Sequence, residues 1–240
     1  MKLKVVVPTT TAMHVDITVA EVARWQSEGL RIDVEACDGD PFLLTGDGDV
    51  FCAGLNLKEL ASLDGAGMRR LLNALDGAVE ALFHHPAPTV ALVNGHAIAG
   101  GAVLAMCCDV VVVRDDPRIR MGLNETAIGL PFPPKVTALA RHRLPRPALE
   151  RVLLGGALHP PAEARALGLA DEVAADAEAV AGAILARLAA HPRAAYALNK
   201  RQLRSAALES ADEARLFEEI LPLWDSEETR GRAAAALKAR

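Results

Sequence analysis

The 240-residue sequence has few aromatic residues and no long hydrophobic run. Aromatic residues make up 3% of the chain and hydrophobic residues 51%, so the core must be built mainly from Ala, Val and Leu. No stretch reaches the roughly 18 apolar residues of a membrane-spanning helix. The longest run, residues 102–108, stops at Asp109, and the N-terminal MKLKVVVPTTT is too short an apolar segment for a secretory signal. We therefore expect no membrane partner.

The sequence also lacks metal-binding cysteine patterns and an excess of basic residues. Its four cysteines, Cys37, Cys52, Cys107 and Cys108, show neither CxxC nor zinc-finger spacing, so no metal site is expected. The adjacent pair Cys107 and Cys108 lies in an apolar run and is interpreted as small core residues. A net charge of −5 gives no reason to expect nucleic acid as a partner, although a local cationic patch can still meet an anionic ligand. These features indicate a protein of the reducing cytoplasm.

Hydrophobic periodicity predicts alternating strands and helices over the first half of the chain. Expected strands cover residues 4–7, 30–36, 41–45, 89–93 and 110–113, and expected helices cover 18–25, 68–83 and 100–108. This alternation predicts an α/β core. From about Pro134 the strand signals nearly vanish and helical patterns continue to the C-terminus. We therefore predict a core over residues 1–190 and a C-terminal helical region over residues 191–240.

Two glycine-containing segments have the composition of ligand-binding turns. In VFCAGLNLKEL (residues 50–60), the small pair Ala53-Gly54 follows a strand and lets the backbone approach a ligand closely. The alternative is a strand-to-helix turn that needs a glycine. In NGHAIAGGAVLAMCCD (residues 94–109), Gly100-Gly101 opens a buried helix, which places unpaired N–H donors at the positive end of the helix dipole. Tight helix packing would explain these glycines but not the rest of the run. His96 and Asp109 are interpreted as structural residues.

A glutamate follows in MGLNETAIGL, among the apolar residues Leu123, Ala127, Ile128 and Leu130. Such surroundings desolvate a carboxylate and raise its pKa toward the range of a general base. The alternative for this residue, Glu125, is a surface side chain that caps a helical turn.

Together these segments resemble the crotonase (enoyl-CoA hydratase/isomerase) superfamily, from about Phe42 to the C-terminus. The resemblance implies a crotonase-like ββα spiral core and an acyl-CoA thioester substrate. It implies that the N–H groups of Leu55 and Gly100 form the oxyanion hole and that Glu125 is the second of the family's two catalytic glutamates. Where a hydratase carries the first glutamate, this chain has Val103. The remaining binding residues implied are Ala53, Gly54, Leu55, Asn56 and Leu57 along the CoA pocket, Lys58 near the nucleotide, and Asn124 beside the base.

The segments AGLNL and GLNET and the loop Leu130-Pro-Phe-Pro-Pro134 are most similar to the Δ3,Δ2-enoyl-CoA isomerases. This similarity implies that Glu125 moves one proton from C2 to C4 of a 3-enoyl-CoA, with no cofactor besides the CoA of the substrate. Two alternatives stay open. The chain could be a hydratase-like or specialised biosynthetic member of the superfamily acting with one glutamate, or a catalytically silent acyl-CoA-binding protein.

The tail, with Phe217, Trp224, Gly231 and a final basic helix, is similar to the C-terminal helices of the superfamily. Those helices pack over an active site and against neighbouring subunits, which implies a homotrimer or a dimer of trimers. With two tryptophans in the whole chain, Trp224 is expected to anchor a contact.

Overall fold

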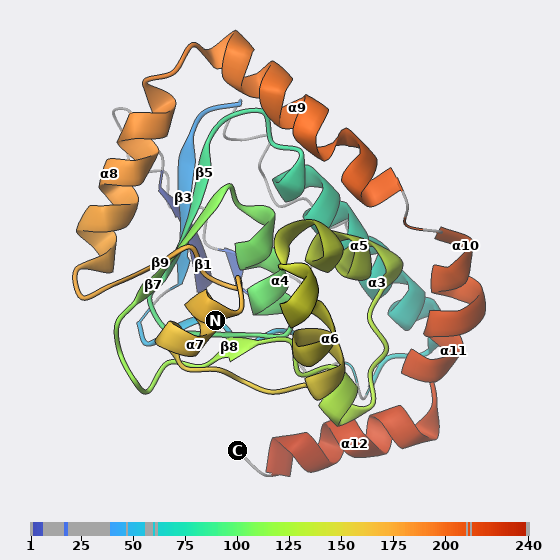
Figure 1. The fold of residues 1–240 in the computed structure, drawn as a ribbon. Helices are drawn as coiled ribbons and strands as arrows, with labels where there is room; N and C mark the ends of the chain where they lie inside the picture. Colours follow the sequence, from blue (N-terminus) through green and yellow to red (C-terminus); the bar gives the residue numbers. More distant parts are fainter. Residues whose placement is uncertain are drawn as a thin grey trace.

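Two sheets and a surrounding set of helices make up the part of the chain described by the computed structural model (Figure 1). That part comprises residues 2–6, 17–18, 39–46, 48–55, 60, 62–209, 211 and 213–238. The predicted helix 18–25 (apart from Thr18, which belongs to a strand) and the predicted strand 30–36 lie outside it, as does Cys37. Asn56, Leu57 and Lys58 of the predicted binding segment also lie outside it.

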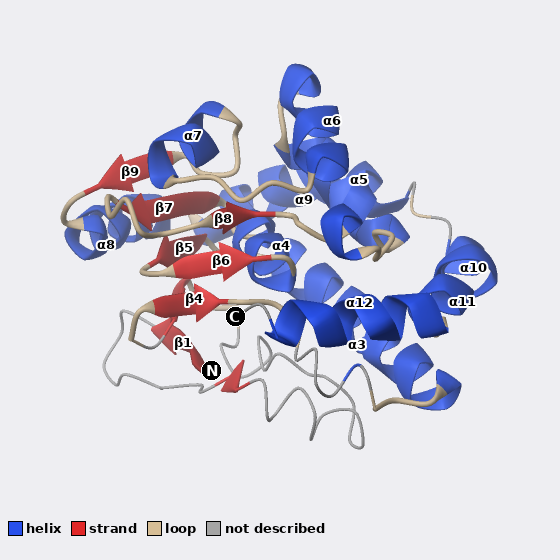
Figure 2. Cartoon of the chain, turned by 90° about the horizontal axis from the view of Figure 1, so that it is seen from below, coloured by secondary structure: helices blue, strands red, loops and turns tan. Residues whose placement is uncertain are grey.

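The strands form one large sheet and one small sheet. Their bounds are β1 (Lys2–Val6), β2 (Ile17–Thr18), β3 (Phe42–Gly46), β4 (Val50–Cys52), β5 (Thr89–Val93), β6 (His96–Ile98), β7 (Val110–Arg114), β8 (Met121–Gly122) and β9 (Glu172–Ala174). The large sheet has the order β2-β1-β3-β5-β7-β9, and the small sheet has the order β4-β6-β8. β1 runs antiparallel to β2 and β3, and the other pairs are parallel. Figure 2 shows the three strands of the small sheet side by side.

The helices fill the connections and form the C-terminal part. Their bounds are α3 (Gly65–Phe83), α4 (Gly100–Cys107), α5 (Pro134–Arg143), α6 (Arg146–Gly155), α7 (Pro161–Ala166), α8 (Ala177–Ala189), α9 (Arg193–Glu209), α10 (Glu213–Arg215), α11 (Leu221–Trp224) and α12 (Glu227–Lys238). A short 3-10 turn, η2 (Thr126–Ile128), follows β8, and a π-helical turn, η3 (Leu216–Ile220), lies between α10 and α11.

The same unit of two strands and a helix occurs three times in succession. β3-β4-α3, β5-β6-α4 and β7-β8-α5 each place one strand in the large sheet, one strand in the small sheet and one helix beside them. Parallel strands need such crossover connections. The predicted α/β class with a ββα spiral core is confirmed.

Side chains of the central strands point alternately to the two faces of the large sheet and pack into two hydrophobic layers. On one face, Leu43, Val90 and Val112 pack against α8, which covers that side of the large sheet in Figure 1. On the other face, neighbours such as Leu44 and Val111 join the main core with α3 and α4. Burial on both faces explains why these strands read as continuous apolar runs in the sequence.

Helix α3 shows why its segment is helical. The Asp64 side chain accepts a hydrogen bond from the Gly67 N–H at 2.7 Å, which caps the first turn. The predicted apolar face is buried at Met68, Leu71, Leu72, Val79 and Leu82, while Leu75 lines a cavity. The helix begins three residues before the predicted start at Met68 and ends at Phe83 as predicted.

Several other predicted strands and helices are found close to their expected positions, but the structure contains further strands that were not predicted. The strands 41–45, 89–93 and 110–113 are found within one residue of their predicted bounds, as is the helix 100–108. The short strands β6 and β8 were missed. The expectation that strands nearly vanish after Pro134 missed β9, which pairs with β7 at the edge of the large sheet.

The C-terminal helices fold back onto the same chain. α11 contacts α3, and α12 contacts η2, so the tail lies along the side of the core in Figure 1. The predicted division at residue 190 falls between α8 and α9 and stays a prediction. In the described part of the chain, no helix is both long and apolar enough to cross a membrane.

Candidate active site

A cavity of about 300 Å³ lies where the carboxyl ends of β4, β6 and β8 meet α3, α4 and α11. Five of the predicted site residues line it: Ala53, Leu55, Gly100, Asn124 and Glu125. They come from three separate segments of the chain. The spiral brings these segments together because β4, β6 and β8 run parallel and end on the same side of the small sheet.

The first wall is the turn after β4. Gly54 has a positive φ of 83°, which glycine adopts without steric cost. A Cβ atom on Gly54 would lie 3.0 Å from the Ala99 Cβ and 3.3 Å from the Gly100 nitrogen. The missing side chain therefore lets this turn contact the second glycine segment directly.

The second wall is the start of α4. Ala99, the N-cap residue, has φ 53° and ψ −123°, a conformation that costs an L-residue about 1–3 kcal/mol. Its N–H donates to the Gly122 carbonyl at 2.9 Å, and its carbonyl accepts from the Val103 N–H at 3.0 Å. Gly101 is required next, because a Cβ atom there would lie 1.9 Å from the Cys52 carbonyl oxygen. The strained turn thus fixes the backbone that presents Gly100.

The two predicted oxyanion donors lie close together. A Cβ atom built on Gly100 would come within 4.0 Å of the Leu55 nitrogen and 3.6 Å of the Gly54 Cα. Among the described residues, neither the Leu55 N–H nor the Gly100 N–H has a hydrogen-bond acceptor. Gly100 is also the first residue of α4, where the helix dipole is positive. This end of the cavity can bind an oxygen atom that carries negative charge.

Glu125 is the only ionisable side chain among the described residues that line the cavity. It is 7% exposed, and its Oε2 atom is buried without a hydrogen-bond partner. Burial raises the pKa of this carboxyl to about 7, and a hydrogen bond from its own backbone N–H opposes the rise. The predicted desolvation is confirmed, and the alternative of a surface glutamate is wrong.

The segment around Glu125 is held by backbone contacts. The Leu130 N–H donates to the Glu125 carbonyl at 2.9 Å, and the Thr126 hydroxyl donates to the Leu153 carbonyl at 2.7 Å. Asn124 precedes the glutamate, and its Oδ1 atom is likewise buried without a partner. Two adjacent side chains therefore carry free acceptor atoms in an otherwise apolar cavity.

Val103 supplies apolar wall to the same cavity and is 1% exposed. The position where the resemblance implies a first glutamate in hydratases is therefore at the site and cannot accept or donate a proton. Leu75, Ile98, Val136 and Leu158 extend this apolar lining.

The C-terminal part supplies a further wall. Trp224 of α11 lines the cavity, is 2% exposed, and donates its indole N–H to the Pro131 carbonyl at 2.8 Å. The prediction that Trp224 anchors a contact is confirmed, and the contact lies within its own chain. Its place at the cavity agrees with the resemblance of the tail, which implies helices packed over the site, whereas Leu158 was not among the predicted site residues.

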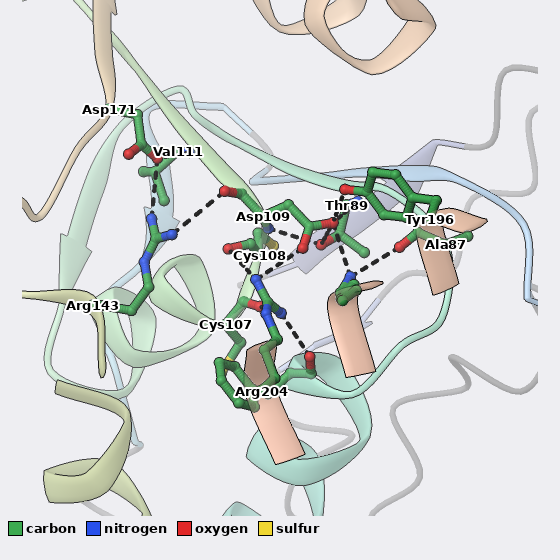
Figure 3. A network of polar contacts seen from close by, with 12 residues as sticks. Ala87, Thr89, Cys107, Cys108, Asp109, Val111, Arg143, Asp171, Tyr196 and Arg204 are labelled. Atoms are coloured by element: carbon green, nitrogen blue, oxygen red, sulfur yellow. Dashed lines mark hydrogen bonds and ion pairs between the residues drawn. The ribbon is translucent and has the colours of Figure 1, made fainter. Parts of the chain in front are cut away.

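The two residues interpreted as structural lie outside the cavity. His96 accepts a hydrogen bond from the Arg120 N–H through Nδ1 at 3.0 Å. Asp109 is at the centre of the network in Figure 3, where it binds the Thr89 N–H at 2.7 Å, Lys200 Nζ at 2.8 Å and Arg204 Nη2 at 2.8 Å. The Tyr196 hydroxyl also donates to it, at 3.0 Å. Both structural interpretations are confirmed.

These residues and this fold place the chain in a known class. A sequence profile of the family described as enoyl-CoA hydratase/isomerase matches residues 33–222. The chain belongs to the enoyl-CoA hydratase/isomerase family.

Similar proteins carry both names of that family. The human mitochondrial enoyl-CoA delta isomerase 1 is 33% identical over 184 residues, which cover 74% of this chain and 61% of the human protein. A putative enoyl-CoA hydratase of Thermus thermophilus is 36% identical over 152 residues, covering 62% of this chain and 59% of that protein. The chain thus spans about three fifths of the length of these relatives.

Among solved structures, the human mitochondrial Δ3-Δ2-enoyl-CoA isomerase superposes with a TM-score of 0.81 at 25% identity. The match covers 93% of this chain and 88% of that one.

Proposed function

We propose that the protein is a Δ3,Δ2-enoyl-CoA isomerase, which moves the double bond of a 3-enoyl-CoA thioester into conjugation with the carbonyl group. One observation carries the proposal: Glu125 is the single carboxylate among the described residues of the cavity, with Val103 in place of a second one. The similarity to isomerases of human mitochondria supports it.

In the proposed reaction, the thioester oxygen accepts hydrogen bonds from the N–H groups of Leu55 and Gly100. Removing a proton from C2 turns this oxygen into an enolate oxygen, whose negative charge these donors and the dipole of α4 stabilise. Each such donor contributes about 3–4 kcal/mol to a reaction of this kind.

Glu125 is the proposed base. Its ionised carboxylate takes a proton from C2, and the electron pair moves onto the thioester oxygen, which gives a dienolate. The protonated Glu125 then returns the proton to C4, the C3–C4 double bond becomes a C2–C3 double bond, and the carboxylate is restored. No cofactor or metal enters this proposed cycle, because the CoA group is part of the substrate.

The closest competing reaction is hydration of a 2-enoyl-CoA. Addition of water needs one group to deprotonate the water and another to position it, a task for which a pair of carboxylates serves better than one. Because the chain is also similar to a putative enoyl-CoA hydratase, hydration has to be assayed as well. We therefore propose that purified protein be assayed in parallel with a 3-enoyl-CoA and a 2-enoyl-CoA. Rapid hydration of the second without isomerisation of the first would refute the proposal, and turnover of neither would favour a silent acyl-CoA-binding protein.

A gain-of-function variant sharpens the distinction. Val103→Glu adds a second carboxylate to the cavity and is expected to raise hydration of a 2-enoyl-CoA above that of Val103→Gln by about tenfold or more. The glutamine variant is the matched control, since it has the same size without the charge. Equal hydration by both variants would show that this position does not decide the reaction.

The homotrimer or dimer of trimers and the cytoplasmic location stay predictions. Assembly is supported by two exposed leucines on α9, Leu198 at 44% and Leu203 at 76%. Analytical ultracentrifugation measures the assembly directly.

A further inference from the structure

Trp224 is the largest side chain in the cavity wall, and it reaches the site from the C-terminal part of the chain. Trp224 belongs to a hydrophobic cluster that also contains Leu60, Met68, Leu72 and Leu130. The cluster is separate from the main core and joins α3, the loop after η2 and α11. The cavity is therefore bounded by packing between two regions far apart in the sequence.

The wall is fixed as well as large. The indole N–H of Trp224 donates to the Pro131 carbonyl at 2.8 Å, and Pro133 of the same loop lines the cavity. A buried tryptophan with its N–H bonded has few alternative positions. The π-helical turn η3 directly precedes α11, and such turns are frequent at functional sites.

The cavity volume limits what fits against this wall. At about 300 Å³, it lies at the lower end of the roughly 300–1,000 Å³ found for small-molecule sites. Apart from Asn124 and Glu125, the described side chains that line it are apolar. The space left for an acyl chain is therefore small and apolar.

We infer that Trp224 limits the acyl-chain length accepted by the site and that the substrates are short- and medium-chain acyl-CoA thioesters. The inference rests on the proposed function for the position of the thioester beside Leu55 and Gly100. It goes further in assigning a specificity role to a residue of α11 and a size to the acyl group.

The first experiment measures binding separately from catalysis. Saturated acyl-CoA thioesters of about 4 to 16 carbons are titrated into the 240-residue protein by isothermal calorimetry. Saturated chains have no double bond to move, so their affinity reports the pocket alone. We expect the tightest binding among the shorter chains, of up to about ten carbons, and an affinity about tenfold or more lower at about fourteen. The kcat/KM values for 3-enoyl-CoA thioesters are expected to follow the same order.

Three variants assign the preference to the wall. Trp224→Ala removes the indole and is expected to move the optimum to chains longer by about two to four carbons. Trp224→Phe keeps a ring but loses the N–H and is expected to keep the original optimum. Leu223→Ala, at a neighbouring side chain that is 53% exposed, is the matched control and should change nothing. If the alanine variant does not fold, Trp224→Leu takes its place, with a smaller shift in the same direction.

The outcomes separate the inference from the proposed function. A short- or medium-chain optimum that moves to longer chains in Trp224→Ala or Trp224→Leu supports the inference, even if no isomerisation is detected and the proposed function fails. Isomerisation with equal affinity for all chain lengths leaves the proposed function intact and overturns the inference. A folded Trp224→Ala or Trp224→Leu protein with the wild-type optimum also overturns it.

Discussion

Two carboxylates with little exposure lie beyond the two ends of α4, and they have opposite surroundings. Asp109, just after the C-terminal end, has a side chain 10% exposed and is bound by Lys200, Arg204, Tyr196 and Thr89. Glu125 faces the cavity at the N-terminal end, and its Oε2 atom has no partner. Burial of a carboxylate therefore does not itself indicate function. The two groups differ in whether hydrogen-bond donors surround the carboxylate.

The physical reason is the cost of the charged form. A buried carboxylate that binds cations and N–H groups keeps its charge and fixes the chain around it. One without donors is held near the point of protonation, as the pKa of about 7 for Glu125 indicates. The first is suited to joining α9 to the core, and the second to exchanging a proton.

The largest expected effect is on catalysis. Glu125→Gln should lower kcat for 3-enoyl-CoA by about 10³–10⁴-fold, because the amide cannot take a proton from C2. Affinity for a saturated acyl-CoA should stay within a few-fold, since the donors at Leu55 and Gly100 are unchanged. Steady-state kinetics and calorimetry measure the two quantities. Wild-type turnover in the variant would show that Glu125 is not the base.

The second effect is on stability. Asp109→Ala should lower the free energy of unfolding by about 3–5 kcal/mol, because it leaves Lys200 and Arg204 buried without their carboxylate. Urea denaturation measures the loss. Tyr196→Phe removes one hydrogen bond to the same carboxylate and is expected to cost only about 1 kcal/mol. If Asp109→Ala were as stable as wild type while Glu125→Gln unfolded, the assignment of roles to the two carboxylates would be reversed.

The third effect is on the pH dependence of the free energy of unfolding, to which Glu125 contributes. The pKa of the Glu125 carboxyl is about 7 in the folded protein and near its ordinary value of 4.5 in the unfolded chain. Between these values the folded state binds more protons than the unfolded state, so the free energy of unfolding falls as pH rises. Relative to Glu125→Gln, the wild type should lose roughly 3 kcal/mol between pH 4.5 and pH 7, and no more above. Denaturation of both proteins across this range tests it, and a constant difference would mean that the carboxyl titrates normally.

The smallest effect concerns the pH dependence of the rate. Because the base must be ionised, kcat/KM should rise about tenfold per unit below pH 7 and level off above pH 8. Asp109→Asn, if folded, should keep this profile, since its side chain does not face the cavity. A profile whose midpoint moves in that variant would connect the two carboxylates.

Much of the fold and the centre of the site could be predicted because their signals are local. The Gly100-Gly101 pair before an apolar helix, and Glu125 among apolar neighbours, are visible in short windows of sequence. β6 and β8 were missed because strands of three and two residues have no periodicity to detect. They are defined by pairing with each other and with β4.

Contacts between residues distant in the chain were harder to predict, both around Asp109 and in the wall of the cavity. Tyr196 and Lys200 bind Asp109 across 87 and 91 residues, and Trp224 reaches Pro131 across 93. No short window contains both members of such a pair. The sequence therefore identifies residues that can form such contacts, but the pairs themselves are defined by the folded structure.

The position of Trp224 also fixes the order in which the cavity can form during synthesis. A ribosome extends the chain from its N-terminus, so the segments that carry Leu55, Gly100 and Glu125 emerge well before α11. Until α11 packs against α3, the cavity lacks the wall that Trp224 supplies. Under the proposed function, the complete site would therefore form only when the last helices dock.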